Sequence, residues 1–288
     1  MKAQQLKWVI IITLALIWGS SFILIKKGLV GLDPFQLGSL RIIFCGMFLL
    51  IVGFKSLSSI PLRQWKFIAL TSFFGTFIPA YLFAIAETKV SSSVCSVLNS
   101  LTPLNTLILG SFLFGINFKR NQFIGIITGL LGTVLLIFMG AQNEGSENEY
   151  YAVLVLIATL CYATNVNLIK KYLSDMNPLS ITTGNFVVML FPAIFILFLT
   201  DFTAKMNLAS TQHAMLFVVV LGILGTAVAN VLFYKLIQIS SPVFASSVTY
   251  LIPIVACLWG ILDNEILNAF QLLGAFVILI GVYLANKK

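Results

Sequence analysis

Residues 18–27 read WGSSFILIKK and residues 162–171 read YATNVNLIKK, so one segment recurs 144 positions later in altered form. The last four letters of the two copies are identical, and Tyr162 stands at the position of Trp18. Both copies close an apolar run of about 20 residues, the length at which a helix crosses the hydrocarbon core of a bilayer. The pair therefore indicates a duplicated unit built from membrane-spanning helices.

The correspondence continues along both halves of the chain. At shifts of 144 to 150 residues, the matched pairs are Pro34 with Pro178, Arg41 with Asn185, Gly75-Thr76 with Gly225-Thr226, Ser96 with Ser246, Asn99 with Thr249, Pro103 with Pro253, Gly125 with Gly274 and Gly132 with Gly281. One match in a chain rich in Leu and Ile carries little weight, whereas an ordered series indicates an internal repeat. We predict two related units, at residues 1–140 and 150–288.

The composition excludes a soluble domain. Of the 288 residues, 59% are hydrophobic and 9% are charged, and the mean hydropathy is +1.04. A soluble domain carries about 25% charged residues, because its whole surface faces water. So few charges are enough only for the ends of helices whose sides face lipid.

Ten apolar runs are long enough to cross a membrane, and short polar gaps separate them. They cover residues 8–25, 35–54, 66–86, 91–114, 121–140, 151–169, 179–200, 214–236, 242–262 and 269–285. Because each unit holds five runs, an odd number, the second unit enters the membrane in the opposite sense to the first. The predicted fold is an all-α membrane protein with ten transmembrane helices arranged as two inverted five-helix repeats. Inverted repeats of this kind are typical of secondary transporters.

The distribution of Lys and Arg predicts the orientation. One set of alternate gaps and termini holds twelve basic residues, and the other set holds four. Cytoplasmic loops carry the excess of basic residues in membrane proteins. We therefore expect a multi-pass protein of the cytoplasmic (inner) membrane with both termini in the cytoplasm.

Several short motifs resemble those of a known family. They are Trp18-Gly19-Ser20-Ser21-Phe22 followed by Lys26, Arg41 early in the second run, Leu-x-Pro at 101–103 and 251–253, and Glu265-x-Leu267 before a Gly-spaced final run. In this order and spacing the chain resembles, over essentially its whole length, the EamA-like branch of the drug/metabolite transporter superfamily. The resemblance implies a ten-helix carrier with a central cavity that exports amino acids, other metabolites or amphiphilic compounds. The first unit departs from the family, with Gly115-Ile116-Asn117 where an acidic residue is often found.

Polar and aromatic side chains inside the apolar runs are the candidate substrate-binding residues, because a polar group in lipid is costly unless it faces a cavity or a partner. They are Trp18, Ser21, Arg41, Tyr81, Asn99, Tyr162, Asn165, Asn230, Thr249 and Tyr250. The alternative for the Ser, Thr and Asn residues is hydrogen bonding between helices. Arg41 has three alternatives: binding a substrate carboxylate, snorkelling to the outer interface, or pairing with Glu87.

Two prolines occupy matching positions in the fourth and ninth runs. Pro103 and Pro253 each remove an intrahelical hydrogen bond. We expect them to act as gating hinges, although such prolines also simply shape a bundle.

The sequence offers little material for catalysis. His213 is the single histidine, and the four cysteines fall inside apolar runs with no CxxC pair. Neither a metal site nor a cofactor is expected, and the protein is not expected to be an enzyme.

The function predicted from these features is that of a secondary transporter or facilitator, which exports a small organic metabolite by alternating access. The expected partners are a small-molecule substrate and the lipid bilayer, without nucleic acid, and the expected state is a monomer or a weak homodimer. Glu87 and Glu265 are the candidates for proton coupling, and uncoupled facilitation is the alternative. A channel-like or non-transporting membrane protein, and a membrane-embedded enzyme, are the rival functions.

Overall fold

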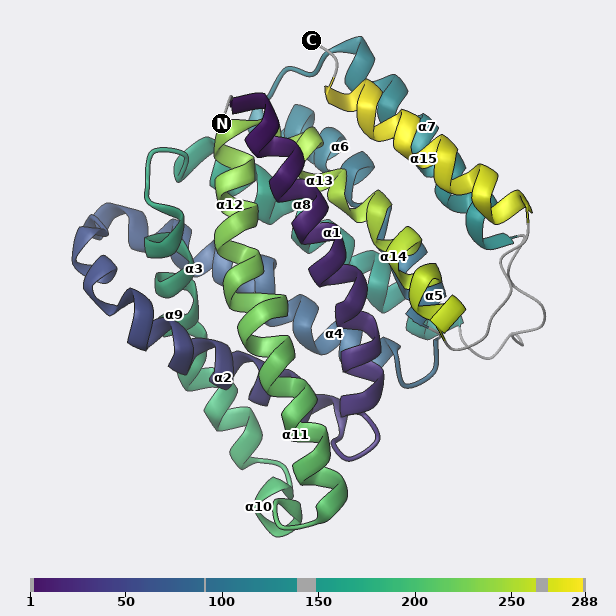
Figure 1. Cartoon of the computed structure of the whole chain (residues 1–288). Coiled ribbons are helices and arrows are strands. Elements are labelled where there is room, and N and C mark those ends of the chain that lie inside the picture. The colour runs from purple at the N-terminus through teal and green to yellow at the C-terminus, as the bar shows by residue number, and fades with distance from the viewer. Residues whose placement is uncertain (1–2, 91, 139–148, 263–268, 287–288) are drawn as a thin grey trace.

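The computed structural model describes residues 3–90, 92–138, 149–262 and 269–286, and these residues form helices and their connections, with no strand among them (Figure 1). The helices are α1 (Ala3–Gly28), α2 (Pro34–Gly53), α3 (Trp65–Ser72), α4 (Ile78–Ala86), α5 (Ser92–Asn99), α6 (Thr102–Phe114), α7 (Arg120–Phe138), α8 (Glu149–Tyr172), α9 (Pro178–Phe198), α10 (Phe202–Lys205), α11 (Ala209–Gly222), α12 (Ala229–Ile239), α13 (Pro242–Ser246), α14 (Val248–Leu262) and α15 (Ala269–Asn286). Glu265 lies outside the described residues.

Six helical stretches in the described part of the chain are long and apolar enough to cross a membrane. They are Gln4–Gly28, Pro34–Ser59, Leu62–Ala86, Tyr150–Tyr172, Pro178–Phe198 and Ala209–Ile239. Two shorter apolar helices, Thr102–Phe114 and Pro242–Val255, fall in the fourth and ninth predicted runs. The all-α membrane class agrees with the prediction, and the number of ten transmembrane helices stays a prediction.

Matching caps begin the second helix of each predicted unit. The Asp33 carboxylate accepts hydrogen bonds from the backbone N–H groups of Phe35 and Gln36, directly before Pro34. The Asn177 side chain accepts from the Leu179 N–H, directly before Pro178. An Asp or Asn cap followed by proline satisfies free N–H groups and presets the helical φ angle. The sequence thus fixes where α2 and α9 start.

Four of the apolar stretches are not regular α-helices. Phe73–Phe77 and Ile223–Val228 form π-helical turns, which join α3 to α4 and α11 to α12 without a break. The fourth predicted run divides into α5 and α6 after Asn99, and the ninth divides into α13 and α14 at Ser247. The two π-helical turns lie at matching places in the two predicted units, and the two breaks fall in corresponding runs.

Glycines allow one helix pair to pack very closely. Figure 1 shows α7 and α15 side by side along one edge of the bundle. A Cβ atom on Gly132 would lie 2.6 Å from the backbone nitrogen of Ile278. A Cβ atom on Gly281 would lie 2.8 Å from the carbonyl oxygen of Gly125. Real Cβ atoms do not approach backbone so closely, so only glycine fits at these two positions.

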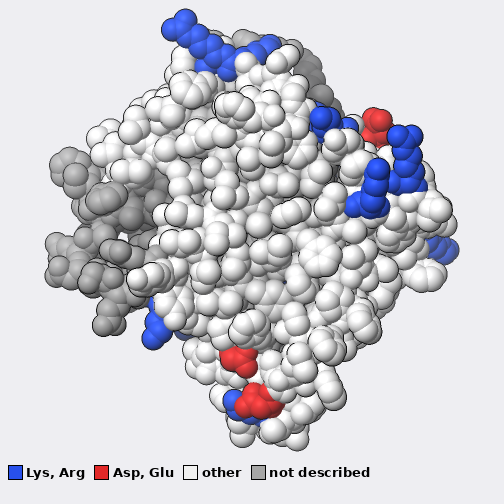
Figure 2. Space-filling model, turned by 180° about the vertical axis from the view of Figure 1, so that it is seen from behind, with Lys and Arg blue, Asp and Glu red and all other residues white. Residues whose placement is uncertain are grey.

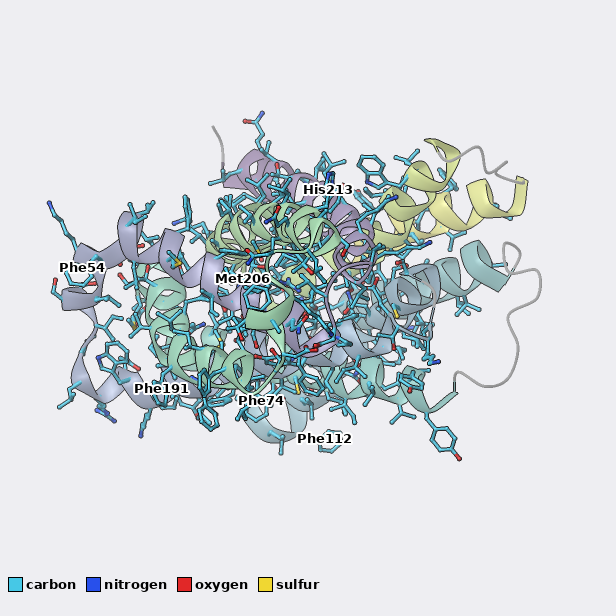
Figure 3. All side chains as sticks on the ribbon, turned by 90° about the horizontal axis from the view of Figure 1, so that it is seen from below. Phe54, Phe74, Phe112, Phe191, Met206 and His213 are labelled. Atoms are coloured by element: carbon cyan, nitrogen blue, oxygen red, sulfur yellow. The ribbon has the colours of Figure 1, made fainter. Side chains whose placement is uncertain are left out.

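The surface is that of a protein surrounded by lipid. Figure 2 shows Lys and Arg gathered mainly toward the upper end, acidic residues mainly at the lower end, and a broad uncharged band between them. Phe112, Phe191 and Phe54 extend outward from the helices with exposed fractions of 85%, 79% and 65% (Figure 3). Large apolar side chains in these places are stable in hydrocarbon and costly in water.

The two Lys-Lys pairs lie at opposite ends of the α11–α12 stretch. Lys170 Nζ donates to carbonyl oxygens at the C-terminal end of α12, including that of Ser240 at 2.8 Å. The connection that follows Lys26 and Lys27 instead contacts the beginning of α11, where Thr211 Oγ1 donates to the carbonyl oxygen of Gly31 at 3.1 Å. Equivalent residues of the two predicted units therefore lie at opposite ends of the bundle.

The close α7–α15 contact predicts the effect of filling it. Gly281→Leu should destabilise the protein by about 2 kcal/mol, because the added side chain collides with the α7 backbone. The measurement is the midpoint of thermal unfolding of purified protein in detergent. Leu279→Ala, at a position that is 51% exposed, is the matched control and should change the midpoint little. Equal midpoints for Gly281→Leu and the control would contradict the described packing.

Candidate functional site

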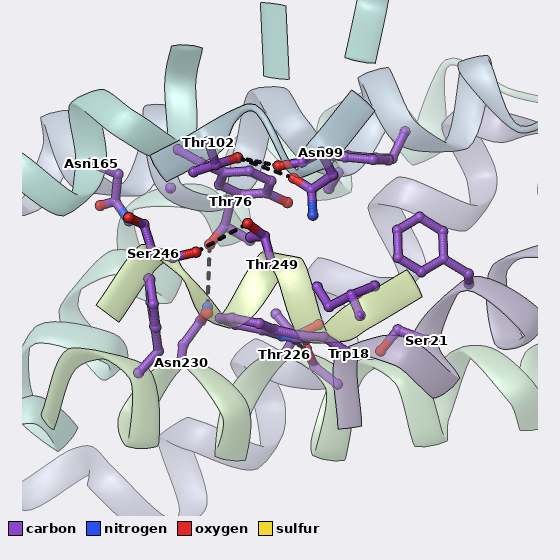
Figure 4. Close-up of a pocket in the computed structure, with 18 of the residues that line it drawn as sticks. Trp18, Ser21, Thr76, Asn99, Thr102, Asn165, Thr226, Asn230, Ser246 and Thr249 are labelled. Carbon is purple, nitrogen blue, oxygen red and sulfur yellow. Dashed lines mark hydrogen bonds between the residues drawn. The ribbon is translucent and has the colours of Figure 1, made fainter. Parts of the chain in front are cut away.

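A cavity of about 840 Å³, the part open to solvent included, lies among helices of both predicted units (Figure 4). Its lining residues are Trp18, Ser21, Phe22, Ile25, Arg41, Gly75, Thr76, Ala80, Phe83, Asn99, Thr102, Tyr162, Asn165, Val166, Gly225, Thr226, Asn230, Phe233, Ser246, Thr249 and Ile252. Cavities that hold small organic ligands have a mostly apolar wall with a few polar groups. The wall of this cavity has that character.

The irregular points of the helices all border this cavity. Gly75 and Thr76 belong to the first π-helical turn. Gly225 and Thr226 belong to the second turn. The breaks contribute the remaining positions, with Asn99 and Thr102 around the first break and Ser246 and Thr249 around the second. The site is therefore built where the helices depart from regular geometry.

Each π-helical turn receives a side chain from the other predicted unit. A Cβ atom on Gly75 would lie 2.6–2.7 Å from the amide atoms of Asn165, and one on Gly225 would lie 2.8 Å from Ser21 Oγ. Ser21 and Asn165 are repeat partners, as are Gly75 and Gly225. Glycine at each turn leaves the space that these polar side chains occupy.

Trp18 is held by a hydrogen bond and by an aromatic neighbour. Its indole Nε1 donates to the carbonyl oxygen of Gly225 at 3.0 Å. Its ring meets Phe233 edge-on, with the ring centroids 5.0 Å apart. Phe22 and Phe83 form a second edge-on pair with centroids 6.0 Å apart. These rings give the cavity an apolar wall with a fixed shape.

Arg41 is the one charged side chain among the described residues that line the cavity. Its Nε donates to Thr226 Oγ1 at 2.8 Å, and Thr226 Oγ1 donates in turn to the carbonyl oxygen of Leu221 at 3.0 Å. Within the described part of the chain Arg41 forms no ion pair, so the pairing with Glu87 is absent. The guanidinium is thus oriented by a hydroxyl and places a positive charge beside the cavity.

Three amide side chains line the cavity. Asn230 Nδ2 lies 3.4 Å from Thr76 Oγ1 and donates to it. Asn99 Oδ1 accepts from Thr102 Oγ1 at 3.3 Å. Asn165 is only 2% exposed, and its Oδ1 has no hydrogen-bond partner. A buried acceptor without a hydrogen-bond donor carries a desolvation cost, which the packing of Asn165 against Gly75 must offset.

Eight of the ten predicted substrate-binding residues line this one cavity, and two do not. Tyr81 is directed elsewhere, because its hydroxyl hydrogen-bonds with Ser39 Oγ at 2.9 Å. Tyr250 is fully buried and donates to the carbonyl oxygen of Ile126 at 3.0 Å. Its ring fills the space left by Gly129 of α7. Both tyrosines therefore bond to structural partners and do not line the cavity.

Four polar lining residues were absent from the predicted set, namely Thr76, Thr102, Thr226 and Ser246. The repeat held a signal for three of them, since Thr76 matches Thr226 and Ser246 matches Ser96. Polar pairs that recur at equivalent positions of an internal repeat are thus informative about the cavity. Thr102 gives no comparable signal in the sequence.

The two predicted hinge prolines occupy different structural positions. Pro103 lies in the first turn of α6, immediately after the helix break. Pro253 lies inside α14, several residues beyond the break at Ser247. The first proline begins a helix and the second interrupts one, so their matched spacing does not give matched geometry. A hinge role stays a prediction for both.

A second hollow surrounds Glu87, just beyond the end of α4, and Lys26 and Asp33 also line it. Glu87 Oε2 accepts from Ser92 Oγ at 2.9 Å, and Oε1 has no partner. Burial raises the pKa of the Glu87 carboxyl to about 8, although the Ser92 hydrogen bond, Arg41 and Lys26 favour the charged form. The carboxyl group therefore exchanges its proton near neutral pH.

The raised pKa of Glu87 predicts a pH dependence of stability. The folded state holds this proton more tightly than the unfolded state, so the contribution is present at low pH and is lost as the pH rises from about 4.5 to about 8. The midpoint of thermal unfolding should therefore be lower at pH 8.5 than at pH 6. Glu87→Gln should reduce that difference, and an unchanged difference would contradict the assignment. Asp175→Asn, at an exposed carboxyl, is the control.

Comparison with known proteins gives matches over the whole chain. The sequence model of the EamA-like transporter family matches residues 6–138 and again residues 150–287. An uncharacterized inner membrane transporter of Escherichia coli, YedA, is 29% identical over 282 residues, which cover 95% of this chain and 88% of that protein. A probable amino-acid metabolite efflux pump of Salmonella typhimurium is 24% identical over 280 residues, which cover 93% and 90%.

A solved crystal structure has the same fold. The two chains superpose with a TM-score of 0.75 at 16% sequence identity, over 96% of this chain and 95% of the other. An identity this low supports the fold alone. The overall arrangement of helices is thus shared with a structure determined by experiment.

Proposed function

This chain belongs to the EamA-like transporter family, and from that premise we propose that it exports a small organic metabolite as a secondary transporter or facilitator. Its relatives are named as membrane transporters, and one of them is named as a probable amino-acid metabolite efflux pump. The proposed substrate is accordingly amino-acid-like or amphiphilic. The proposed mechanism is alternating access, in which the two units rock around a central site.

The observation that carries the proposal is the cavity at the irregular points of the helices. Irregular backbone at membrane depth is stable only where protein or a wet cavity covers it. Here a single cavity borders both π-helical turns and both helix breaks. Its aromatic wall suits an apolar body, and its amides and Arg41 suit polar groups. This combination favours a binding site for a solute over an unspecific pore.

We further propose ten transmembrane helices in two inverted repeats, with both termini in the cytoplasm. The double match of the family model supports two units. The positions of the two Lys-Lys pairs at opposite ends of the α11–α12 stretch support the inversion. The excess of basic residues in one set of gaps supports the cytoplasmic placement of the termini.

The export function predicts a change in the solutes that cells retain. Cells that lack the protein should accumulate at least one small organic solute relative to cells that produce it, as measured by untargeted mass spectrometry of cell extracts. Asn99→Ala should reduce export of that solute by about tenfold or more, because a polar contact is removed from the cavity wall. Asn105→Ala is the matched control, since Asn105 donates to Thr159 Oγ1 and does not line the cavity.

Two outcomes contradict the export proposal. Identical solute profiles with and without the protein would argue against any export of cell metabolites. Conductance of single molecules far above the turnover of a carrier, in a planar bilayer, would favour a channel. Membrane abundance of each variant, measured by immunoblotting, separates loss of transport from loss of protein.

The inverted topology predicts which loops face the same compartment. Lys27→Cys places an exposed thiol in the last turn of α1, and Asp175→Cys places one on the α8–α9 connection. A membrane-impermeant maleimide applied to intact cells should label residue 27 and leave residue 175 unlabelled until the membrane is opened. The described native cysteines, Cys45, Cys95 and Cys161, are buried, and a variant without introduced cysteine corrects for background. Labelling of both positions from outside would disprove the inversion.

A further inference from the structure

A lysine joins α8 to α12 at the inner end of the bundle, which is the upper end in Figure 1, where the N-terminus lies. The Lys170 ammonium, in the last turn of α8, donates to the carbonyl oxygens of Ile237 (3.2 Å), Gln238 (3.3 Å) and Ser240 (2.8 Å). An ammonium group has three donors, so all of them are used. A cation at the C-terminal end of a helix is also stabilised by the helix dipole.

A glutamine completes this contact in the opposite direction. The Gln238 side-chain amide donates to the carbonyl oxygens of Leu173 (3.4 Å) and Met176 (2.7 Å), which follow the end of α8. The end of α8 and the end of α12 are thus joined by donors from both sides. We call this set of contacts the inner latch.

The outer end holds the repeat partners of the latch residues. At the shifts of 144 and 150 residues, the pairs are Lys170 with Lys26, Leu173 with Leu29, Met176 with Leu32, Ile237 with Glu87 and Gln238 with Thr88. All five partners line the hollow beside the end of α4. Residues that are in contact at the inner end therefore surround a hollow at the outer end.

The outer residues are not joined to one another. Within the described part of the chain, the Lys26 ammonium forms no ion pair with the Glu87 carboxylate, although both groups line the hollow. Leu173 and Ile237 are fully buried, whereas their partners Leu29 and Glu87 are only partly buried. Equivalent parts of the two units are thus closed at the inner end and open at the outer end.

The hollow lies one helical turn beyond the central cavity. Phe22 and Phe83 belong to the cavity wall, and each precedes a residue of the hollow by four positions, namely Lys26 and Glu87. Residues four apart on a helix lie on the same face. Toward the inner end, Phe233 of the cavity wall is followed four positions later by a residue of the inner latch, which is fully buried. The cavity is therefore covered on its inner side.

We propose that the inner latch and the hollow are the two gates of the transport cycle, and that they close in turn. In the opposite state Lys170 releases α12, the hollow closes, and Lys26 binds the Glu87 carboxylate and the end of α4. This inference rests on the proposed export by alternating access and identifies the residues that switch it. Inverted repeats exchange their conformations when such a carrier turns its site to the other side.

The two latches differ in chemistry, so each can be removed separately. Ile237 has no group for Lys170 except its carbonyl oxygen, whereas its partner Glu87 offers Lys26 a carboxylate. The Thr88 hydroxyl, in the place of the Gln238 amide, already donates to the carbonyl oxygen of its own helix at Ile85 (2.7 Å). The outer latch therefore depends on one ion pair, and the inner latch depends on hydrogen bonds to backbone.

The test measures the width of both ends in the purified full-length protein in lipid nanodiscs, by pulsed electron paramagnetic resonance. One pair of spin labels replaces Asp175 and Lys235, which are exposed on either side of the inner latch. The other pair replaces Lys27 and Lys89, which are exposed near the outer hollow. The four native cysteines are replaced by alanine in every sample. With both latches intact, we expect one main population at each end.

Removal of the inner latch should move both ends in opposite directions. Lys170→Ala should lengthen the inner distance, shorten the outer distance and raise the ratio of inner-open to inner-closed molecules about tenfold or more, because charge-assisted hydrogen bonds are lost. Gln238→Ala should shift the ratio in the same direction. Adding Lys26→Ala to Lys170→Ala should return the outer distance toward its original value. Lys171→Ala is the matched control, since this adjacent lysine donates to the Phe114 carbonyl oxygen of α6.

Distances in both latch variants equal to those of the control would overturn the inference. So would a longer inner distance with an unchanged outer distance, because Lys170 would then only cap α12. Loss of local packing at the inner end cannot by itself shorten a distance at the outer end. The two latch variants change different residues, so one that fails to fold leaves the other to decide.

The outcome is separable from the export proposal. If the two distances change together while cells with and without the protein retain the same solutes, the gates stand and the export proposal fails. If cells without the protein accumulate a solute while Lys170→Ala and Gln238→Ala keep the original distances, export stands and the assignment of the gates fails.

Discussion

The structure depends on one constraint: inside a bilayer, every backbone N–H and C=O group must find its partner within the protein. Regular helices meet that requirement without help, and interrupted helices do not. In this chain two helices contain π-helical turns and two are divided by breaks. All four irregular points border the same cavity. The position of the candidate site follows from where this chain tolerates irregular backbone.

The side chains at these points complete the hydrogen bonding that the irregular backbone leaves open. The carbonyl oxygen of Gly225 accepts from the Trp18 indole, and that of Leu221 accepts from Thr226. Thr226 can then serve only as an acceptor toward Arg41, which orients the guanidinium at the cavity. The hydrogen bonds that the irregular backbone needs thus help to determine where the Arg41 guanidinium and the Trp18 ring lie.

From the sequence it was easier to predict which polar residues lie near the cavity than to predict the direction in which each side chain points. Asn99, Asn165 and Asn230 were recognisable because an amide in an apolar run needs a cavity or a partner. Tyr250 follows Thr249 directly, yet the two face about 100° apart on a helix, and small errors in helix rotation exchange their roles. The helix break at Ser247 introduces such a rotation, and no residue type marked it. The same limit applies to Pro103 and Pro253, whose equal spacing concealed unequal geometry.

The two units use equivalent residues in different ways, and the proposed mechanism needs that difference. Trp18 donates to Gly225 in the π-helical turn of the other unit and meets Phe233 edge-on, whereas its partner Tyr162 stacks on Phe83, also in the other unit, with the ring centroids 6.0 Å apart. Arg41 donates to Thr226 of the second unit, while its partner Asn185 contacts Thr71 of the first unit and Tyr234 of its own unit. Two inverted units with identical contacts would be equally open, or equally closed, toward both sides of the membrane. A carrier that exposes its site to one side at a time must therefore hold its repeats in unequal conformations, as these contacts do.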